Sequence, residues 1–298
     1  MVATPPSSLA LAPTANNDVG FEPFTCRLPE GDQAWPIVVS SPHSGREYAG
    51  PFAGLTHLEQ GVLRRSEDAY MDCLIADIPH LGIPTLSANF PRVFVDANRG
   101  ADEIDPGMYS DRVRSEVRPD SRRTASGLGV IPRISADGRQ LYGRKLKFAE
   151  AETRLEGCYW PYHHRLAELL AQTRRRFGAA FLLDMHSMPN QSARGADIVL
   201  GDRFGQSCSA EIVDIVERQF RAQGFVTVRN TPYAGGHTTE TYGRPESGTH
   251  VLQIEVNRSL YMDEKRVHPN AGLDRLCGEF THFISAIRES LSPVLRLS

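Results

Sequence analysis

The sequence lacks the features that mark several classes of protein. Its 298 residues include only five cysteines, none in CxxC spacing, which excludes a zinc ribbon and argues against a disulfide scaffold. Acidic and basic residues nearly balance, with a net charge of −3, so we expect no nucleic-acid partner. No apolar run reaches the length of a bilayer span, and residues 1–20 lack the basic and apolar regions of a signal peptide. We therefore expect a cytoplasmic protein without a membrane partner, with a flexible tail over residues 1–20.

The apolar residues that are present alternate between two kinds of pattern. Short runs rich in β-branched residues, most of them apolar on both faces, predict buried strands over 35–41, 92–98, 179–185, 196–201, 225–230 and 250–256. Helical spacing of apolar residues predicts helices over 57–78, 162–178, 209–220 and 270–291. This alternation is typical of an α/β fold, so we expect one three-layer α/β/α domain over 21–298 with a central mixed, largely parallel sheet. Residues 111–144 show no period and predict a long surface excursion of the kind that forms lids.

Polar side chains gather at the ends of the predicted strands. His43 follows the first strand by two residues, and the run FLLDMHS brings Asp184 and His186 to one face of another. In HVLQIEV, Glu255 lies on the opposite face from three aliphatic residues. A carboxylate inside a buried strand is costly unless it is paired or binds a metal. The carboxyl edge of such a sheet is where α/β folds bind ligands, so we expect the active site there.

Two histidines and a carboxylate suit a catalytic zinc ion with one position left for water. His43 and His186 are the candidate ligands from the strand ends, and the segment RRSEDAYMD over 64–72 offers several acidic candidates for the third. Glu255 would then remain free to move protons between water and a leaving group. His237, in the Gly-rich loop YAGGHTTETYG, is a candidate for contact with substrate.

Five short motifs together resemble one known family. SPHSG, RSEDAYMDCL, FVDANR, LDMHSMP and IEVNRSLYMDE occur in the order found in the N-formylglutamate amidohydrolase family, from about residue 36 to residue 264. The family is similar in fold to zinc carboxypeptidases and aspartoacylases, which hydrolyse amides with one zinc ion and a glutamate. The resemblance therefore implies a zinc-carboxypeptidase-like fold.

The resemblance also implies a ligand set. The histidines of PHSG and DMHS, His43 and His186, would bind the metal, and Asp68 best fits the acidic ligand, with Glu67 as the alternative. In carboxypeptidases the acidic ligand lies three residues after the first histidine. That position holds an arginine here, and Glu47 comes one residue later, so Glu47 remains a further alternative. The cofactor expected is one divalent ion, Zn²⁺.

The remaining roles follow from the same resemblance. Glu255 in IEVNR would be the general acid/base, and Asn98 and Arg99 in DANR resemble a pair that grips a substrate carboxylate. A planar guanidinium binds a carboxylate through two hydrogen bonds, which also makes Arg258 a substrate-binding candidate, with Arg244 behind it.

The expected reaction is metal-dependent hydrolysis of the N-formyl, or another N-acyl, amide of an amino acid. N-formyl-L-glutamate and water would give formate and L-glutamate, so the expected partner is a small molecule. Two alternatives stay open: a different N-acyl amino acid as substrate, and a metal-binding or sensor relative without turnover. A hydrolase using Ser44 or Ser187 as nucleophile is disfavoured because neither serine lies in a GxSxG elbow.

Overall fold

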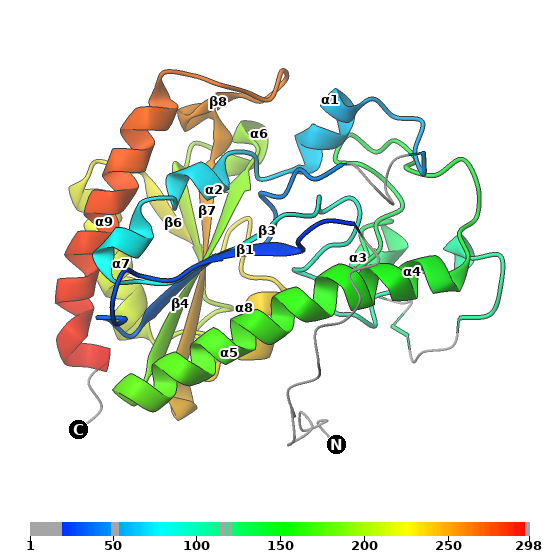
Figure 1. Cartoon of the computed structure of the whole chain (residues 1–298). Helices are drawn as coiled ribbons and strands as arrows, with labels where there is room; N and C mark the ends of the chain where they lie inside the picture. The colour runs from blue at the N-terminus through cyan, green and yellow to red at the C-terminus, as the bar shows by residue number, and fades with distance from the viewer. Residues whose placement is uncertain (1–19, 49–53, 114–116, 119–120, 296–298) are drawn as a thin grey trace.

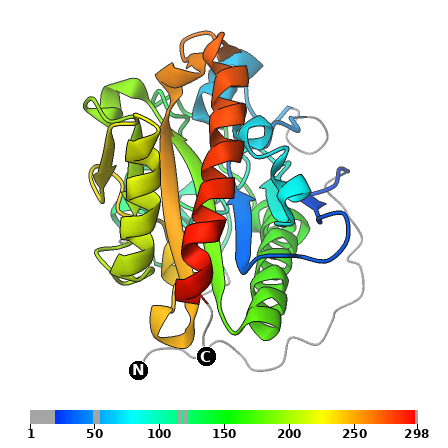
Figure 2. The ribbon, with the colours of Figure 1, turned by 90° about the vertical axis from the view of Figure 1, so that its left-hand side faces the viewer.

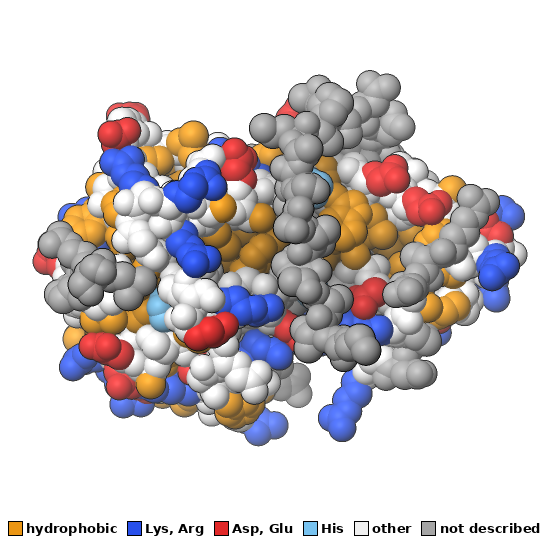
Figure 3. All heavy atoms as spheres, turned by 90° about the horizontal axis from the view of Figure 1, so that it is seen from below, with side chains coloured by type: hydrophobic (Ala, Val, Ile, Leu, Met, Phe, Trp, Pro, Cys, Tyr) orange, Lys and Arg blue, Asp and Glu red, His pale blue; other side chains and the backbone are white. Residues whose placement is uncertain are grey.

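A computed structural model describes residues 20–48, 54–113, 117–118 and 121–295 of the chain. The tail predicted over 1–20 therefore lies, except for its last residue, outside the described part. None of the described helices combines the length and the apolar character that a membrane crossing requires. In the space-filling view from below, acidic and basic side chains are interspersed over the described surface (Figure 3).

A seven-stranded mixed sheet forms the centre of the molecule (Figure 1). Its strands are β1 (Phe24–Arg27), β2 (Ile37–Ser41), β3 (Thr85–Ala88), β4 (Ala180–Met188), β5 (Ile198–Gly201), β6 (Thr227–Arg229) and β7 (Thr249–Asn257). Across the sheet they are ordered β1-β3-β2-β4-β7-β5-β6. The four strands β3, β2, β4 and β7 run parallel to one another, while β1 and the β5–β6 pair run antiparallel to them. The predicted mixed, largely parallel sheet is confirmed.

Helices cover both faces of this sheet (Figures 1 and 2). The helices are α1 (Gln60–Leu63), α2 (Met71–Leu74), α3 (Arg122–Ala125), α4 (Phe148–Arg154), α5 (Trp160–Phe177), α6 (Asn190–Ala193), α7 (Ala210–Ala222), α8 (His237–Tyr242) and α9 (Gly272–Leu295). A π-helical turn (Leu155–Tyr159) joins α4 to α5. Shorter 3-10 turns occupy Arg64–Ser66, Ile78–Leu81, Pro106–Met108, Pro245–Ser247 and Arg258–Leu260, and β8 (Met262–Asp263) pairs with β9 (His268–Pro269). The predicted helices over 162–178, 209–220 and 270–291 correspond to α5, α7 and α9.

Alternation along the central strands divides the core into two halves. In β2, Ile37 and Val39 pack with residues of α2, α7 and α9, whereas Val38 packs with residues of α4 and α5. The strand β4 divides in the same way, and all nine of its residues are buried. Strands that are apolar on both faces are stable only between two layers of helices, which is the three-layer arrangement predicted from the sequence.

The strand predicted over 92–98 is wrong. This segment consists of turns, in which the Phe94 amide donates to the Pro91 carbonyl and the Asp96 amide donates to the Val130 carbonyl. Its apolar residues are buried against the α5 side of the core. The hydrophobicity of the segment therefore indicates its burial correctly, but the segment does not pair with another strand. Two strands of the central sheet, β1 and β3, and the short pair β8–β9 are not predicted by the sequence. In the central sheet, β1 and β3 lie toward one edge and are only four residues each.

The continuous helix predicted over 57–78 is also wrong. The segment contains α1 and α2 as two separate turns, with Glu67 in an extended conformation between them. Tyr70 lies in the left-handed region with a φ of 65°, which interrupts any regular helix. The backbone amide of Asp68 donates instead to the carbonyl of His43, at 2.9 Å. This break brings Asp68 beside the end of β2.

Candidate active site

A cavity of about 590 Å³ lies beside the carboxyl ends of β2, β4 and β7. Its lining includes most of the side chains predicted for the site: His43, Asp68, Asn98, Arg99, His186, Glu255 and Arg258. The excursion predicted over 111–144 contributes to one wall through described residues that include Leu128 and Ile134. The carboxyl edge of the sheet is therefore where the candidate site lies.

Three nitrogen and oxygen atoms form a tight triangle in this cavity. Nδ1 of His186 lies 3.2 Å from Nδ1 of His43 and 3.1 Å from Oδ2 of Asp68, and the third side of the triangle measures 3.4 Å. Two donors bonded to one tetrahedral zinc ion at its usual bond lengths lie about 3.3 Å apart. His43, Asp68 and His186 could therefore hold one divalent cation with little rearrangement.

Each histidine of the triangle is oriented by a second carboxylate. Nε2 of His43 lies 2.7 Å from Oδ1 of Asp96, and Nε2 of His186 lies 3.0 Å from Oδ2 of Asp184. Each Nε2 can thus donate to a carboxylate, which leaves each Nδ1 as an acceptor facing the centre. Although burial opposes it, the charge of Arg92 and the contact with His43 hold the pKa of Asp96 well below its usual range. The sequence places Asp184 on the face of His186 but predicts no role for either aspartate.

Asp68 is fixed by contacts on its other oxygen. Oδ1 of Asp68 accepts from Nη2 of Arg258 at 3.0 Å and from the hydroxyl of Ser187 at 3.3 Å. Arg258 also donates to the carbonyls of Arg65 and Glu67 and to Ser187, and its side chain is 8% exposed. Its guanidinium is therefore occupied by protein groups. This arrangement favours a positioning role for Arg258 over the predicted contact with substrate.

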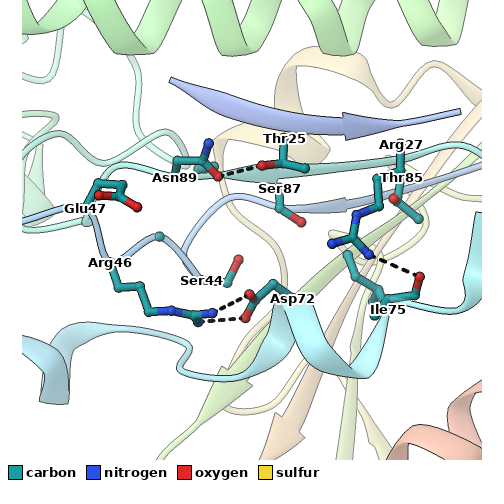
Figure 4. Close-up of a pocket in the computed structure, with 13 residues that line it drawn as sticks. Thr25, Arg27, Ser44, Arg46, Glu47, Asp72, Ile75, Thr85, Ser87 and Asn89 are labelled. Carbon is teal, nitrogen blue, oxygen red and sulfur yellow. Dashed lines mark hydrogen bonds and ion pairs between the residues drawn. The ribbon is translucent and has the colours of Figure 1, made fainter. Parts of the chain in front are cut away.

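The alternative acidic ligands lie elsewhere. The carboxylate of Glu67 accepts from the Tyr48 hydroxyl at 2.7 Å and from Arg64. Glu47 and Asp72 line a second, smaller cavity of about 190 Å³, where Asp72 pairs with an arginine (Figure 4). None of the three triangle residues lines this second cavity. Of the acidic candidates, Asp68 alone contributes an atom to the triangle.

The carboxylates in and around the triangle favour positive charge there. Although burial disfavours a cationic imidazole, Asp184 and Asp68 raise the pKa of His186 well above its usual range. Although burial raises the pKa of Asp68, its contacts with His186 and His43 hold that pKa well below its usual range. A buried group of this kind is stable when it encloses a cation.

Glu255 lies next to the triangle across a strand pair. The β4–β7 register places Glu255 directly opposite His186, and its carboxyl group is buried at the cavity wall. Burial raises the pKa of Glu255. The side-chain amide of Gln253 donates to Oε1 of Glu255 at 2.7 Å. Glu255 is not one of the three residues that form the triangle, so its carboxyl group remains available for proton transfer.

Asn98 links Glu255 to the first turn of α8. Its side-chain oxygen accepts from the amide of Thr238 at 2.9 Å, and its side-chain nitrogen lies 3.3 Å from Oε1 of Gln253. Gly236 packs so closely on Asn98 that a Cβ atom there would overlap the amide group. Asn98 therefore holds Gln253 and, through it, Glu255.

Arg99 presents its guanidinium to the cavity. Nε donates to the Leu128 carbonyl at 3.1 Å and Nη1 to the Asn98 carbonyl at 2.8 Å. Burial lowers the pKa of Arg99, and the nearby guanidinium groups of Arg92 and Arg123 lower it further, while Asp96 opposes them. Arg99 has no carboxylate within ion-pair distance among the described residues, so it can receive an anionic ligand.

His237 lies one layer behind the cavity. The neighbouring Gly236 lines the cavity, but the His237 ring lies 3.1 Å from the Tyr159 hydroxyl and is not among the lining residues. That hydroxyl, at the end of the π-helical turn, donates to the Arg99 carbonyl at 2.8 Å. His237 therefore contacts the tyrosine that holds the Arg99 backbone, and this position favours a supporting role over the predicted contact with substrate.

The buried histidine His163, which lies in the same layer as His237, makes the stability of the folded state depend on pH. Nε2 of His163 donates to the Ala97 carbonyl and Nδ1 accepts from the Tyr242 hydroxyl, both at 2.9 Å. Burial, together with the charge of His237, lowers the pKa of His163 to about 3. The unfolded chain, with a pKa of about 6.5, therefore binds a proton that the folded chain does not as the pH falls from 6.5 towards 3.

We expect the free energy of unfolding to fall in this window, with His163 contributing up to about 1.4 kcal/mol per pH unit. Replacing His163 by glutamine should remove this contribution, so the slope between pH 6 and pH 4 should flatten. Urea unfolding at several pH values measures the slope. The exposed neighbour, in the variant His164→Gln, serves as the control. Equal slopes for the His163→Gln variant and the unchanged protein would show that His163 is not held neutral.

Comparisons with known proteins point to one family. A model of the N-formylglutamate amidohydrolase family matches residues 35–262. The chain is 32% identical over 238 residues to N-formylglutamate deformylase of Pseudomonas aeruginosa, covering 77% of this chain and 83% of that protein. The identity to N-formylglutamate deformylase of Pseudomonas putida is 27%, with 77% and 82% coverage.

A solved structure extends the similarity to three dimensions. The crystal structure of N-formylglutamate amidohydrolase from Ralstonia eutropha JMP134 matches with a TM-score of 0.86 and 37% sequence identity. The match covers 92% of this chain and 100% of that one. A gene product from Agrobacterium tumefaciens, 18% identical, shares the fold with a TM-score of 0.66. The chain belongs to the N-formylglutamate amidohydrolase family.

Proposed function

We propose that this protein hydrolyses the formyl amide of N-formyl-L-glutamate, giving formate and L-glutamate, with one bound zinc ion. The observation that supports the proposal most directly is the triangle of His43, Asp68 and His186 beside the buried carboxyl group of Glu255. Relatives that match most of the chain are named N-formylglutamate deformylase. The proposed place of action is the cytoplasm.

The donor set fits zinc by its chemistry. Two imidazole nitrogens and one carboxylate oxygen are the ligands of many catalytic zinc sites, and the second contacts of the histidines to Asp96 and Asp184 are typical of such sites. When bound, the ion would polarise the amide carbonyl and make a water molecule more acidic. The described residues that line the cavity include no cysteine or methionine, which also suits a hard or borderline ion.

The proton transfers are assigned to Glu255. Its carboxylate would accept a proton from the attacking water and deliver it to the nitrogen of the departing amine. A raised pKa suits both steps, because a group that titrates nearer neutral pH gives a proton back more readily. Gln253, held by Asn98, keeps the Glu255 carboxyl group from rotating.

Arg99 is assigned to the substrate carboxylate. Its guanidinium is buried in the cavity wall and has one terminal nitrogen without a hydrogen bond to the described residues. A carboxylate there would offset the desolvation that lowers the pKa of Arg99. Asn98 and Arg258, predicted from the sequence as substrate ligands, are assigned positioning roles because their donors already contact protein atoms.

The test is a formate-release assay on the purified protein. We expect N-formyl-L-glutamate to be hydrolysed faster than N-acetyl- or N-carbamoyl-L-glutamate. Dialysis against a chelator should abolish the activity, and one equivalent of Zn²⁺ should restore it. A protein that binds zinc but releases no product from any of these amides would instead be a metal-binding relative without turnover. Faster hydrolysis of the acetyl compound would place the reaction on a different acyl group.

A further inference from the structure

Five arginines line the cavity, but they differ in their partners. Arg92 and Arg258 are ion-paired with carboxylates that support the triangle, at 2.8 and 3.0 Å. Arg99 contacts only carbonyl oxygens. Arg123, on α3, has no side-chain hydrogen bond to the described residues, and its nearest carboxylate is Glu103 at 3.9 Å. Arg65 is partnered as loosely as Arg123, with Asp137 at 3.8 Å. Only Arg123 of these two is close enough to Arg99 for its charge to lower the pKa of Arg99, so Arg99 and Arg123 are the pair that could bind one anionic ligand together.

The buried carboxylate of Glu103 connects the backbone segments that carry Arg99 and Arg123. Oε1 of Glu103 accepts from the amide of Gly100, the residue after Arg99, at 3.0 Å. Oε2 of Glu103 accepts from the hydroxyl of Ser121, the N-cap of α3, at 3.1 Å. The chain before Arg123 is therefore tied to the chain after Arg99, although the two segments come from different parts of the sequence.

Among the described residues that line the cavity, the five arginines outnumber the three carboxylates of Asp68, Asp96 and Glu255. The guanidinium of Arg123 is close enough to that of Arg99 to lower the Arg99 pKa, in addition to the effects of burial and of Arg92. Arg123 is 38% exposed, so it lies nearer the mouth of the cavity than the buried triangle does. A ligand with two carboxylates, one held deep and one held near the mouth, would match this distribution of charge.

The proposed substrate has such a shape. In an N-formyl amino acid, the α-carboxylate is separated from the formyl group only by the amide nitrogen and the α-carbon. A glutamate side chain extends its second carboxylate two bonds farther from the formyl group. Arg99 follows Asn98, whose side chain lies 3.3 Å from His186 of the triangle, so Arg99 suits the nearer carboxylate. Arg123, at the mouth, suits the farther one.

We propose that Arg123 binds the side-chain carboxylate of the substrate and so determines the preference of this enzyme for acidic N-formyl amino acids. This inference rests on the proposed function and adds a specificity-determining residue to it. The residue lies in the excursion predicted over 111–144. One role of this excursion would then be to select the substrate side chain.

The experiment compares N-formyl-L-glutamate with N-formyl-L-glutamine, which has the same shape without the second charge. Arg123→Met should lower kcat/KM for formylglutamate about 10- to 100-fold, mainly through KM, because a charge-assisted pair of hydrogen bonds is lost. The value for formylglutamine should stay unchanged. The matched control is Arg122→Met, which removes the same charge from the adjacent exposed position of α3.

The outcomes separate this inference from the proposed function. An equal loss on both substrates in Arg123→Met, or no loss on formylglutamate, would overturn the role of Arg123 while hydrolysis by the unchanged protein still supported the function. If the unchanged protein releases formate from neither substrate, calorimetry with L-glutamate and L-glutamine decides the inference. Tighter binding of glutamate that disappears in Arg123→Met would support it, and equal binding of the two amino acids would refute it.

Discussion

Replacing Glu255 by glutamine is expected to lower kcat for formate release by about 10²- to 10⁴-fold, the usual contribution of a general acid/base. Glutamine has nearly the same shape as glutamate, but its amide cannot accept the proton of water or return it to the amine. The metal content should stay unchanged because Glu255 is not one of the three triangle residues. Initial rates of formate release, together with elemental analysis of the same samples, measure both quantities.

The control for this variant is the same substitution at an exposed carboxylate outside the cavity lining, Glu246→Gln, which also removes one charge. It should leave kcat unaltered. If the Glu255→Gln variant keeps more than about a tenth of the activity, another group transfers the proton and the assignment of Glu255 is wrong. If the variant instead loses its metal along with its activity, Glu255 acts as a ligand, and the triangle must be extended to include it.

The residues on long central strands were the easiest to place from the sequence. In β4, apolar residues occupy both faces, and in β7 one face is aliphatic, so the buried polar residues His186 and Glu255 stand out in the sequence. The period of two also predicts that Asp184 shares a face with His186, and the structure joins the two side chains. Five motifs in family order gave the family, which the comparisons confirm.

The residues on irregular segments could not be placed in this way. In a continuous helix over 57–78, the direction of the Asp68 side chain would follow from the helical period. In the structure, the left-handed Tyr70 and the hydrogen bond from the Asp68 amide to the His43 carbonyl determine where Asp68 lies. Arg258 binds Asp68 across 190 residues of sequence, a contact that no local pattern reveals. Such contacts depend on the complete fold, so the sequence marks Arg258 as a site residue but does not reveal its contact with Asp68.

Replacing His186 by alanine is expected to reduce the zinc content from about one ion per chain to nearly none after dialysis. The substitution removes one of the three donor atoms and leaves the carboxylates of Asp68 and Asp184 without their shared imidazole. A site with two protein donors binds zinc far more weakly than one with three or four, so the ion should be lost to the buffer. Activity on N-formyl-L-glutamate should fall with the metal content.

The matched control is His164→Ala, because His164 is an exposed histidine on α5 and lies outside the cavity lining. It should keep both zinc and activity. Circular dichroism would verify that the His186→Ala variant is folded, so that metal loss can be attributed to the missing donor. A folded His186→Ala variant that retained a full equivalent of zinc would mean that the ion binds elsewhere. The triangle at the ends of β2 and β4 would then not be the metal site, and the mechanism built around it would fail.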